Sequence, residues 1–277
     1  MPLHCLVCIK HVPDTTQVRI DPQTGSLVRS GIPSVINPYD LFALEAALRA
    51  RDEHGGGVTV LSMGPPQAEE ALRKALGFGA NRAILLSDRA FAGADTLATT
   101  YALAAAIRRI DREEPVDLVV CGKQSIDGDT GQVGPGISRR LNYSELTYVC
   151  AMDQISPDER YIRAWRQRED GRELLEGALP ACVTVTEKCS FIRRASLMAL
   201  LAASRQPVEV WTADDVEVER EHLGLKGSPT RVNRIFAPPA REPGEILTRS
   251  GEPLAAGVTE LMDRLAERGL VFGGASD

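Results

Sequence analysis

The sequence predicts an α/β protein built on a doubly wound, mostly parallel sheet. Short apolar runs in the first half alternate with longer segments of helical periodicity, which is the order expected when crossover helices connect parallel strands. The composition, 43% apolar and 25% charged, is typical of a globular chain rather than a disordered or fibrous one. The 277 residues suffice for one large domain or for one domain with an appendage.

Five apolar runs are the predicted strands, at residues 3–9, 58–63, 83–87, 117–121 and 146–149. Residues 17–29 between the first two are predicted to form a surface hairpin, because Pro22 and Gly25 separate two short apolar pairs. Four helices are predicted from capping and periodicity: residues 38–54, residues 67–76, a helix that Asp95 caps, and one that begins between 130 and 136.

The pattern changes after residue 150. Residues 152–156, 161–170 and 173–187 are predicted to be antiparallel strands that add a sheet layer, followed by a helix at 196–204. Five prolines in residues 222–253 predict an extended arm without its own core, and an apolar stripe predicts a final helix at 254–268. We therefore expect an α/β domain at 1–221 and a C-terminal arm with its helix at 222–277.

The charge balance excludes several function classes. Acidic residues number 38 against 32 basic ones, which argues against a nucleic-acid partner or an anionic membrane surface. No apolar run approaches the roughly 18 residues that a membrane span needs, so we expect no direct membrane insertion. The N-terminus does not resemble a secretory signal, and a cytoplasmic protein is expected.

Metal and disulfide chemistry is not expected either. The six cysteines are predicted to be free thiols, and Cys5 and Cys8 point to opposite faces of one strand, so they cannot share a metal. The four histidines are scattered and form no metal-binding spacing. The glycine signatures of P-loop proteins and of ordinary dinucleotide dehydrogenases are also missing.

Position in the fold predicts the ligand site. A doubly wound sheet binds ligands beyond the carboxyl ends of its strands, where the strand order reverses, which we expect between the first and fourth strands. The loops there are residues 8–14 and the glycine-rich residues 122–136, with residues 62–66 nearby. Glycines that open a helix favour phosphate binding. A plain alternative is a surface turn capped by Asp129 or Thr130, with Lys10 solvated, Asp127 a turn former and Asn37 an N-cap.

At these residues the sequence resembles the beta subunit of electron transfer flavoproteins. The resemblance runs in order through VCIKHVPD, INPYDLFALEAAL, VTVLSMGPP, AFAGADTLATT and, above all, GKQSIDGDTGQVGPG. The segment GLKGSPTRVNRIFAPP resembles the branch associated with nitrogen fixation and electron bifurcation more than the mitochondrial-type branch. The resemblance implies a Rossmann-like, adenine-nucleotide-hydrolase-like fold.

The resemblance also implies a heterodimer with an alpha subunit that carries FAD. In the mitochondrial-type branch the beta crevice holds a structural AMP. In the bifurcating branch it holds a second FAD, which takes electrons from NADH. One electron goes to ferredoxin or flavodoxin, and the other goes through the alpha-subunit FAD to a membrane-associated quinone oxidoreductase or an acyl-CoA dehydrogenase. The fold alone leaves a third reading open, a universal-stress-type regulatory module, although the long arm argues against it.

The resemblance assigns the expected cofactor-binding residues. The adenine and ribose end is assigned to Cys8, Ile9, Lys10, Asn37, Ser62, Met63 and Gly64. The phosphates are assigned to Asp129, Thr130, Gly131, Gln132 and Val133, with Gly122, Lys123, Asp127, Gly128 and Gly134 in the same loop. An FAD, unlike AMP, would extend to Asp95, Thr96 and Thr99, which by sequence alone are better explained by helix capping.

No catalytic acid or base is expected, because a flavin carries out electron transfer itself while the protein positions it. No iron–sulfur or other metal ligand set is present, so any cluster belongs to a partner. The family's partner-recognition loop often reads NEPRY, but here CSFIRRASLMALL at 189–201 takes its place. We expect Arg193 and Arg194 to form an exposed docking element there, although arginines in a loop are ordinarily just solvated.

Overall fold

The computed structural model describes residues 2–14, 19–20, 27–28, 33–230, 244–247 and 254–270. The chain divides into two compact units, Met1–Ile235 and Phe236–Asp277, which are described separately.

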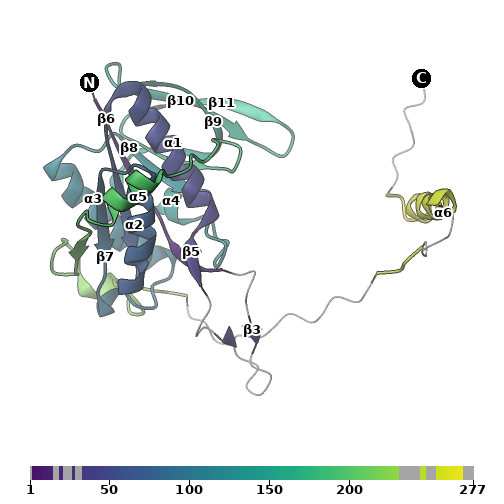
Figure 1. Cartoon of the computed structure of the whole chain (residues 1–277), viewed down its shortest axis with the longest axis horizontal. Helices are drawn as coiled ribbons and strands as arrows, with labels where there is room; N and C mark the ends of the chain where they lie inside the picture. The colour runs from purple at the N-terminus through teal and green to yellow at the C-terminus, as the bar shows by residue number, and fades with distance from the viewer. Residues whose placement is uncertain are drawn as a thin grey trace. The chain divides into compact units, whose positions relative to one another are not determined.

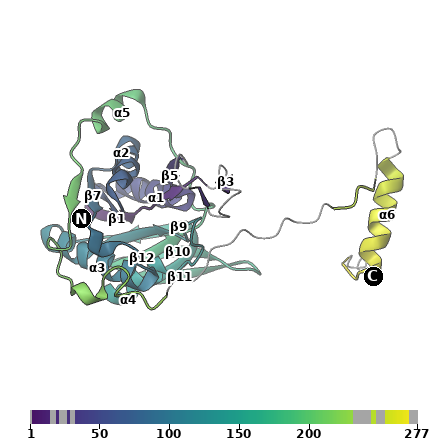
Figure 2. The same ribbon diagram turned by 90° about the horizontal axis from the view of Figure 1, so that it is seen from below.

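The first unit is built on a nine-stranded sheet in the order β11-β10-β9-β12-β8-β1-β6-β7-β13, with helices on both faces (Figures 1 and 2). Its strands are β1 Leu3–Cys8, β6 Gly56–Met63, β7 Arg82–Leu86, β8 Leu118–Gly122, β9 Ser144–Ser156, β10 Tyr161–Gln167, β11 Arg172–Ala178, β12 Ala181–Val185 and β13 Glu209–Trp211. Its helices are α1 Pro38–His54, α2 Glu69–Phe78, α3 Thr96–Glu113, α4 Val133–Leu141 and α5 Leu197–Ala203, with short 3-10 turns η2 Pro66–Ala68, η3 Arg89–Phe91 and η4 Arg220–His222. Two small pairs, β2 His11–Pro13 with β5 Ser34–Ile36 and β3 Arg19–Ile20 with β4 Leu27–Val28, complete it.

The predicted doubly wound core is confirmed. The strand β1 pairs in parallel with β6 on one side and with β8 on the other, so the strand order reverses where it was expected to. Side chains of β1 alternate between two apolar layers: Cys5 and Val7 pack with α1 and α2, while Leu6 and Cys8 pack with α3 and α4. The predicted hairpin is present as the β3–β4 pair.

The prediction for residues 146–187 needs correction. The runs at 146–149 and 152–156 belong to one strand, β9. Residues 173–187 form two strands: β11 is antiparallel to β10, but β12 lies between β8 and β9 and is parallel to both. The predicted antiparallel assignment of β12 was therefore wrong, and the additional strands extend the same sheet instead of forming a layer. The five residues of β12 are all buried, as is typical of a central parallel strand.

The first part of the predicted arm packs against the first unit. Leu223 is buried in the layer of α3, and the Asp95 amide donates a hydrogen bond to Ser228 Oγ at 2.8 Å. Residues 231–243 and 248–253 of the arm lie outside the described residues.

The predicted final helix is present in the second unit as α6, Leu254–Glu267. On α6, Leu254, Val258, Leu261 and Met262 of its apolar stripe are exposed within the described chain. None of the helices in the described segments has the length and apolar character that a membrane span requires.

Two glycines let α4 pack closely against its neighbours. A Cβ on Gly134 would lie 2.3 Å from Thr184 Cγ2 of β12, and one on Gly136 would lie 2.6 Å from Thr100 Cγ2 of α3. Distances this short are not tolerated between carbon atoms, so the glycines set how near α4 sits to the sheet and to α3.

We expect Gly136→Ala to lower the free energy of unfolding by about 1–3 kcal/mol, because the added methyl overpacks the α3–α4 contact. Without this overpacking, replacing a glycine in a helix interior by alanine would raise the free energy of unfolding by up to about 1 kcal/mol. Gly57→Ala is the control, since its Cβ would have no neighbour closer than 4.0 Å. Urea unfolding of both variants measures the difference, and a stabilised Gly136→Ala would contradict the packing argument.

Candidate functional site

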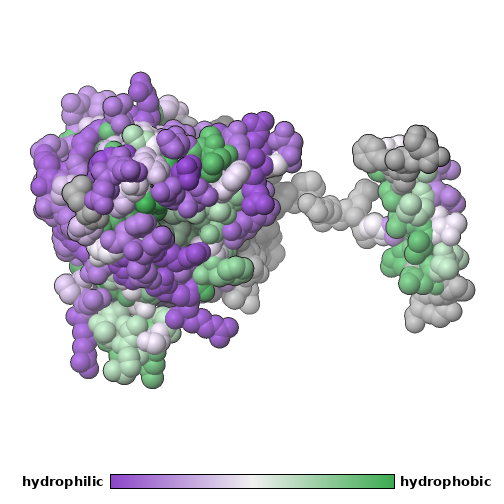
Figure 3. Space-filling view, turned by 90° about the horizontal axis from the view of Figure 1, so that it is seen from above, coloured by the Kyte–Doolittle hydropathy of each residue, from purple (hydrophilic) through white to green (hydrophobic). Residues whose placement is uncertain are grey.

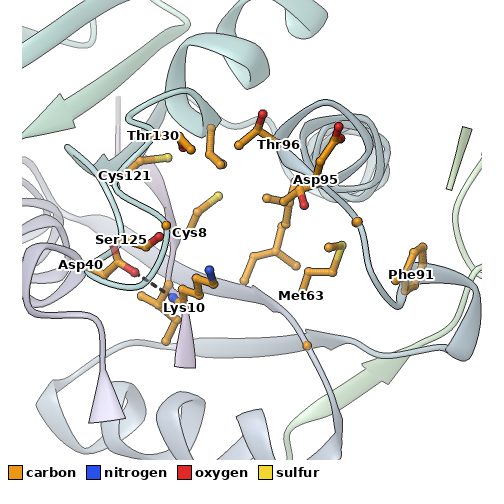
Figure 4. A pocket seen from close by; sticks show the side chains of 18 of the residues that line it. Cys8, Lys10, Asp40, Met63, Phe91, Asp95, Thr96, Cys121, Ser125 and Thr130 are labelled. Carbon is orange, nitrogen blue, oxygen red and sulfur yellow. Dashed lines mark hydrogen bonds between the residues drawn. The ribbon is translucent and has the colours of Figure 1, made fainter. Parts of the chain in front are cut away.

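A cavity of about 830 Å³ lies at the carboxyl ends of β1 and β8, where the strand order reverses (Figure 4). Figure 4 shows Lys10, Ser125 and Thr130 on one side of it and Asp95, Met63 and Phe91 on the other. The sequence-predicted residues that line the cavity are Cys8, Ile9, Lys10, Met63, Gly64, Asp95, Thr96, Thr99, Gly122, Lys123, Gly128, Thr130, Gly131, Gln132, Val133 and Gly134. Segments far apart in the sequence are thus brought together around one space.

Four predicted residues lie outside the lining, and Asn37 is the most informative of them. It occupies the N-cap position of α1, as predicted, but its side chain is fully buried and makes no capping hydrogen bond. Instead Asn37 Nδ2 donates to the Gln124 carbonyl at 2.9 Å, and its Oδ1 accepts from the Ile126 amide at 3.1 Å. Asn37 therefore fixes the backbone of the glycine-rich loop at Gln124 and Ile126, and it does not line the cavity.

The other three are Ser62, Asp127 and Asp129. Ser62 is buried with its hydroxyl unpartnered among the described residues, and strand alternation turns it away from Met63 and the cavity. Asp127 accepts two hydrogen bonds from Lys10 Nζ, both at 2.8 Å. Asp129 has a left-handed backbone, with φ of 50°, and accepts from Gln124 Nε2 at 2.9 Å. Both aspartates thus shape the loop through contacts within the protein.

Asp40 is a buried carboxylate in the cavity wall that the sequence reasoning missed. It accepts from the Lys10 amide at 2.7 Å and from Asn37 Nδ2 at 2.8 Å (Figure 4). Burial raises the pKa of Asp40 to about 7, against the lowering effect of these hydrogen bonds. The available signal was its position three residues after Asn37, on the first turn of α1.

The starts of α3 and α4 both reach the cavity, but they differ in how they are capped. Asp95 accepts from the Leu97 and Ala98 amides, so the capping role that sequence alone favoured is present, and it also accepts from the Thr230 amide. The start of α4 has no side-chain cap, and Val133 and Gly134 of its first turn line the cavity. An uncapped helix start is the natural place for an anion, so α4 is the better phosphate site.

Thr96 connects these two helices, because its hydroxyl donates to Gln132 Oε1 at 2.8 Å. The far wall of the cavity is more apolar and comes from residues that were not assigned to the site, chiefly Phe91 and Leu103, with Arg89 at the surface. A short turn such as η3 carries no periodicity from which sequence reasoning could find it.

The predicted docking element differs from expectation. Arg193 is held by α1: its guanidinium donates to the buried Glu45 carboxylate at 2.7 and 3.0 Å and pairs with Asp52 at 2.9 Å. Arg194 is exposed, as predicted. Three large apolar side chains of this segment are highly exposed: Phe191, Leu197 and Met198 are 96%, 72% and 74% exposed. Figure 3 shows α5 as an apolar protrusion from a largely hydrophilic surface.

Comparison with known proteins agrees with this architecture. The family model described as the electron transfer flavoprotein domain matches residues 24–216. Protein FixA of Bradyrhizobium diazoefficiens is 53% identical over 252 residues, covering 90% of this chain and 88% of the relative. The caffeyl-CoA reductase-Etf complex subunit CarD of Acetobacterium woodii is 44% identical over 270 residues, covering 97% and 100%.

The electron transfer flavoprotein subunit beta of Clostridium acetobutylicum is 44% identical over 254 residues, covering 92% of this chain and 95% of the relative. The chain belongs to the electron transfer flavoprotein family, as a beta-type electron transfer subunit of the group that includes FixA.

Proposed function

We propose that this chain holds FAD in the cavity between β1 and β8, as the beta subunit of a cytoplasmic heterodimer with an alpha subunit. Electrons enter from NADH at this site. One passes to ferredoxin or flavodoxin, and the other passes through the alpha-subunit FAD to a quinone oxidoreductase or an acyl-CoA oxidoreductase. Membership of the electron transfer flavoprotein family removes the universal-stress-type reading.

The extent of the cavity carries the proposal. It runs from the glycine-rich loop to the segment 87–99, and its 830 Å³ lies near the upper end of the roughly 300–1,000 Å³ range of ligand pockets. A mononucleotide with its phosphate at the start of α4 would occupy the loop side and leave the wall of Phe91, Thr99 and Leu103 without a ligand. In a dinucleotide such as FAD, the half that a mononucleotide lacks fills this side of the cavity.

The lining residues divide by chemistry in a way that suits FAD. The uncapped turn at Val133 and Gly134, with Thr130 and Gly131, offers backbone and hydroxyl donors to phosphates. Cys8, Ile9 and Met63 offer an apolar floor at the strand ends for an adenosine. Bound FAD supplies the redox chemistry, and this chain orients it and limits its exposure to water.

One relative supports the choice of partners. The name of the Acetobacterium woodii relative assigns it to a complex of an Etf with caffeyl-CoA reductase, which is an acyl-CoA oxidoreductase. We extend that class of partner to this chain and propose that the apolar protrusion at α5, with Phe191, is a surface available for contact with the oxidoreductase.

One observation favours the alternative of a structural AMP. Asp95 lies at the side of the cavity that only FAD would reach. Its carboxylate already accepts hydrogen bonds from backbone amides of this chain, and it adds negative charge at that side. A conventional beta subunit with AMP would leave that carboxylate undisturbed.

The first prediction concerns cofactor content. The heterodimer purified with its alpha subunit and extracted with acid should release two FAD and no AMP, measured by chromatography against standards. One FAD with one AMP per heterodimer would instead establish the conventional subunit and overturn the proposal.

The second prediction separates the two sides of the cavity. Thr99→Phe should reduce the FAD content of the heterodimer from two toward one, because the ring fills the side next to α3. Leu97→Phe is the matched control, since Leu97 is 50% exposed and does not line the cavity. If the crevice holds AMP, Thr99→Phe should leave the nucleotide content unchanged.

The third prediction concerns α6, which we propose packs on the alpha subunit through its apolar stripe. Leu261→Asp should weaken heterodimer formation at least about tenfold, because it places a charge in an apolar interface. Ala256→Asp adds the same charge on the opposite side of the helix, at about 100° per residue, and should bind normally. Co-purification of tagged alpha subunit measures both, and equal retention would exclude α6 from the interface.

A further inference from the structure

Tyr148 has a backbone conformation that its surroundings in β9 do not explain. Its φ is 55°, in the left-handed region, although it lies inside a strand and aromatic residues favour extended backbone. Among the described residues, the other non-glycine positions with positive φ are Asp129, Asn142 and Arg160, and these lie in a loop, at the end of α4 and in a turn. A bulky residue in this conformation carries backbone strain.

The strand is bulged at this point. Four residues of β9, Leu146–Val149, lie opposite three residues of β12, Val183–Val185. The Tyr148 amide leaves the regular ladder and donates to Thr184 Oγ1 at 3.0 Å. Left-handed bulge positions favour glycine, and bulges next to functional sites redirect a side chain. The tyrosine at this position therefore points to a use for its side chain.

The side chain reaches the glycine-rich loop. A Cβ on Gly131 would lie 3.7 Å from Tyr148 Oη, and Gly131 lines the cavity just before the uncapped start of α4. Tyr148 is 46% exposed, and within the described part of the chain its hydroxyl has no hydrogen-bond partner. Tyr148 itself is not among the residues that line the cavity, but its free phenol donor lies beside Gly131, which is one of them and directly precedes the backbone donors that the cavity offers to an anion.

We propose that Tyr148 is a further nucleotide-binding residue, whose hydroxyl donates a hydrogen bond to a phosphate held at the start of α4. This inference rests on the proposed function, because it needs a nucleotide phosphate in the cavity. A hydrogen bond to a charged acceptor repays the backbone strain at the bulge. Both FAD and AMP carry the phosphate concerned, so both serve as probes.

The experiment uses the heterodimer depleted of nucleotide and titrated separately with FAD and with AMP. Tyr148→Phe should weaken binding of the native nucleotide about 10- to 100-fold, as the loss of a hydrogen bond to a charged group predicts. The melting temperature without nucleotide should stay within about 2 °C of the original protein. Tyr161→Phe on β10, away from the cavity, is the matched control and should change neither quantity.

Tyr148→Gly separates a binding role from a structural one. Glycine relieves the left-handed strain, so the nucleotide-free heterodimer should melt no lower than the original, while its affinity falls at least as far as that of Tyr148→Phe. Affinity within twofold of the original for Tyr148→Phe would overturn the inference. So would a fall in affinity matched by a lower melting temperature in both variants. If the original heterodimer binds neither FAD nor AMP, the proposed function itself fails, and the inference falls with it.

Discussion

The architecture of the cavity depends on the hydrogen bonds made by the buried side-chain amide of Asn37. It connects the loop after β8 to the segment that follows β1, through the carbonyl of Gln124 and the amide of Ile126. It also fixes one oxygen of Asp40, whose other oxygen fixes the Lys10 backbone. A buried network of this kind is stable only when every member is satisfied, so the loop has one conformation to adopt. The cavity wall is thus prepared before any ligand arrives.

The charged side chains around the cavity are largely neutralised by the chain itself. Lys10 is paired with Asp127, and Lys123 is paired with Glu187 and lies over the ring of Tyr39. Exposed pairs such as these contribute little to stability, since solvent and side-chain entropy offset them. Their effect is that the loop side of the cavity offers backbone amides and hydroxyls, rather than free lysine ammonium groups, to an anion. Such donors fix the position of a phosphate more narrowly than a flexible ammonium does.

The sequence was sufficient to predict the doubly wound core and the location of the cavity, because β1, β6, β7 and β8 are continuous apolar runs and their loops are distinctive. It did not predict β12 correctly, because a short buried run after a hairpin carries no sign of its partners, and pairing with β8 is a long-range event. Asn37 and Ser62, which the resemblance assigned to ligand contact, lie outside the cavity lining, and the sequence alone does not reveal which face such a side chain takes. Asp40 and Phe91 were missed because burial, rather than residue type, gives them their importance.

The return of β12 to the middle of the sheet has a consequence for how the protein is made. Until residue 185 has been synthesised, β8 is an edge strand with unpaired backbone groups, and α4 lacks the surface of Thr184 against which Gly134 packs. All the residues that line the cavity precede β12 in the chain, the last of them being Gly134. The cavity-lining residues are therefore all synthesised before the strand that completes the sheet beside them. During that interval the unpaired edge of β8 in the nascent chain is open to pairing with another chain.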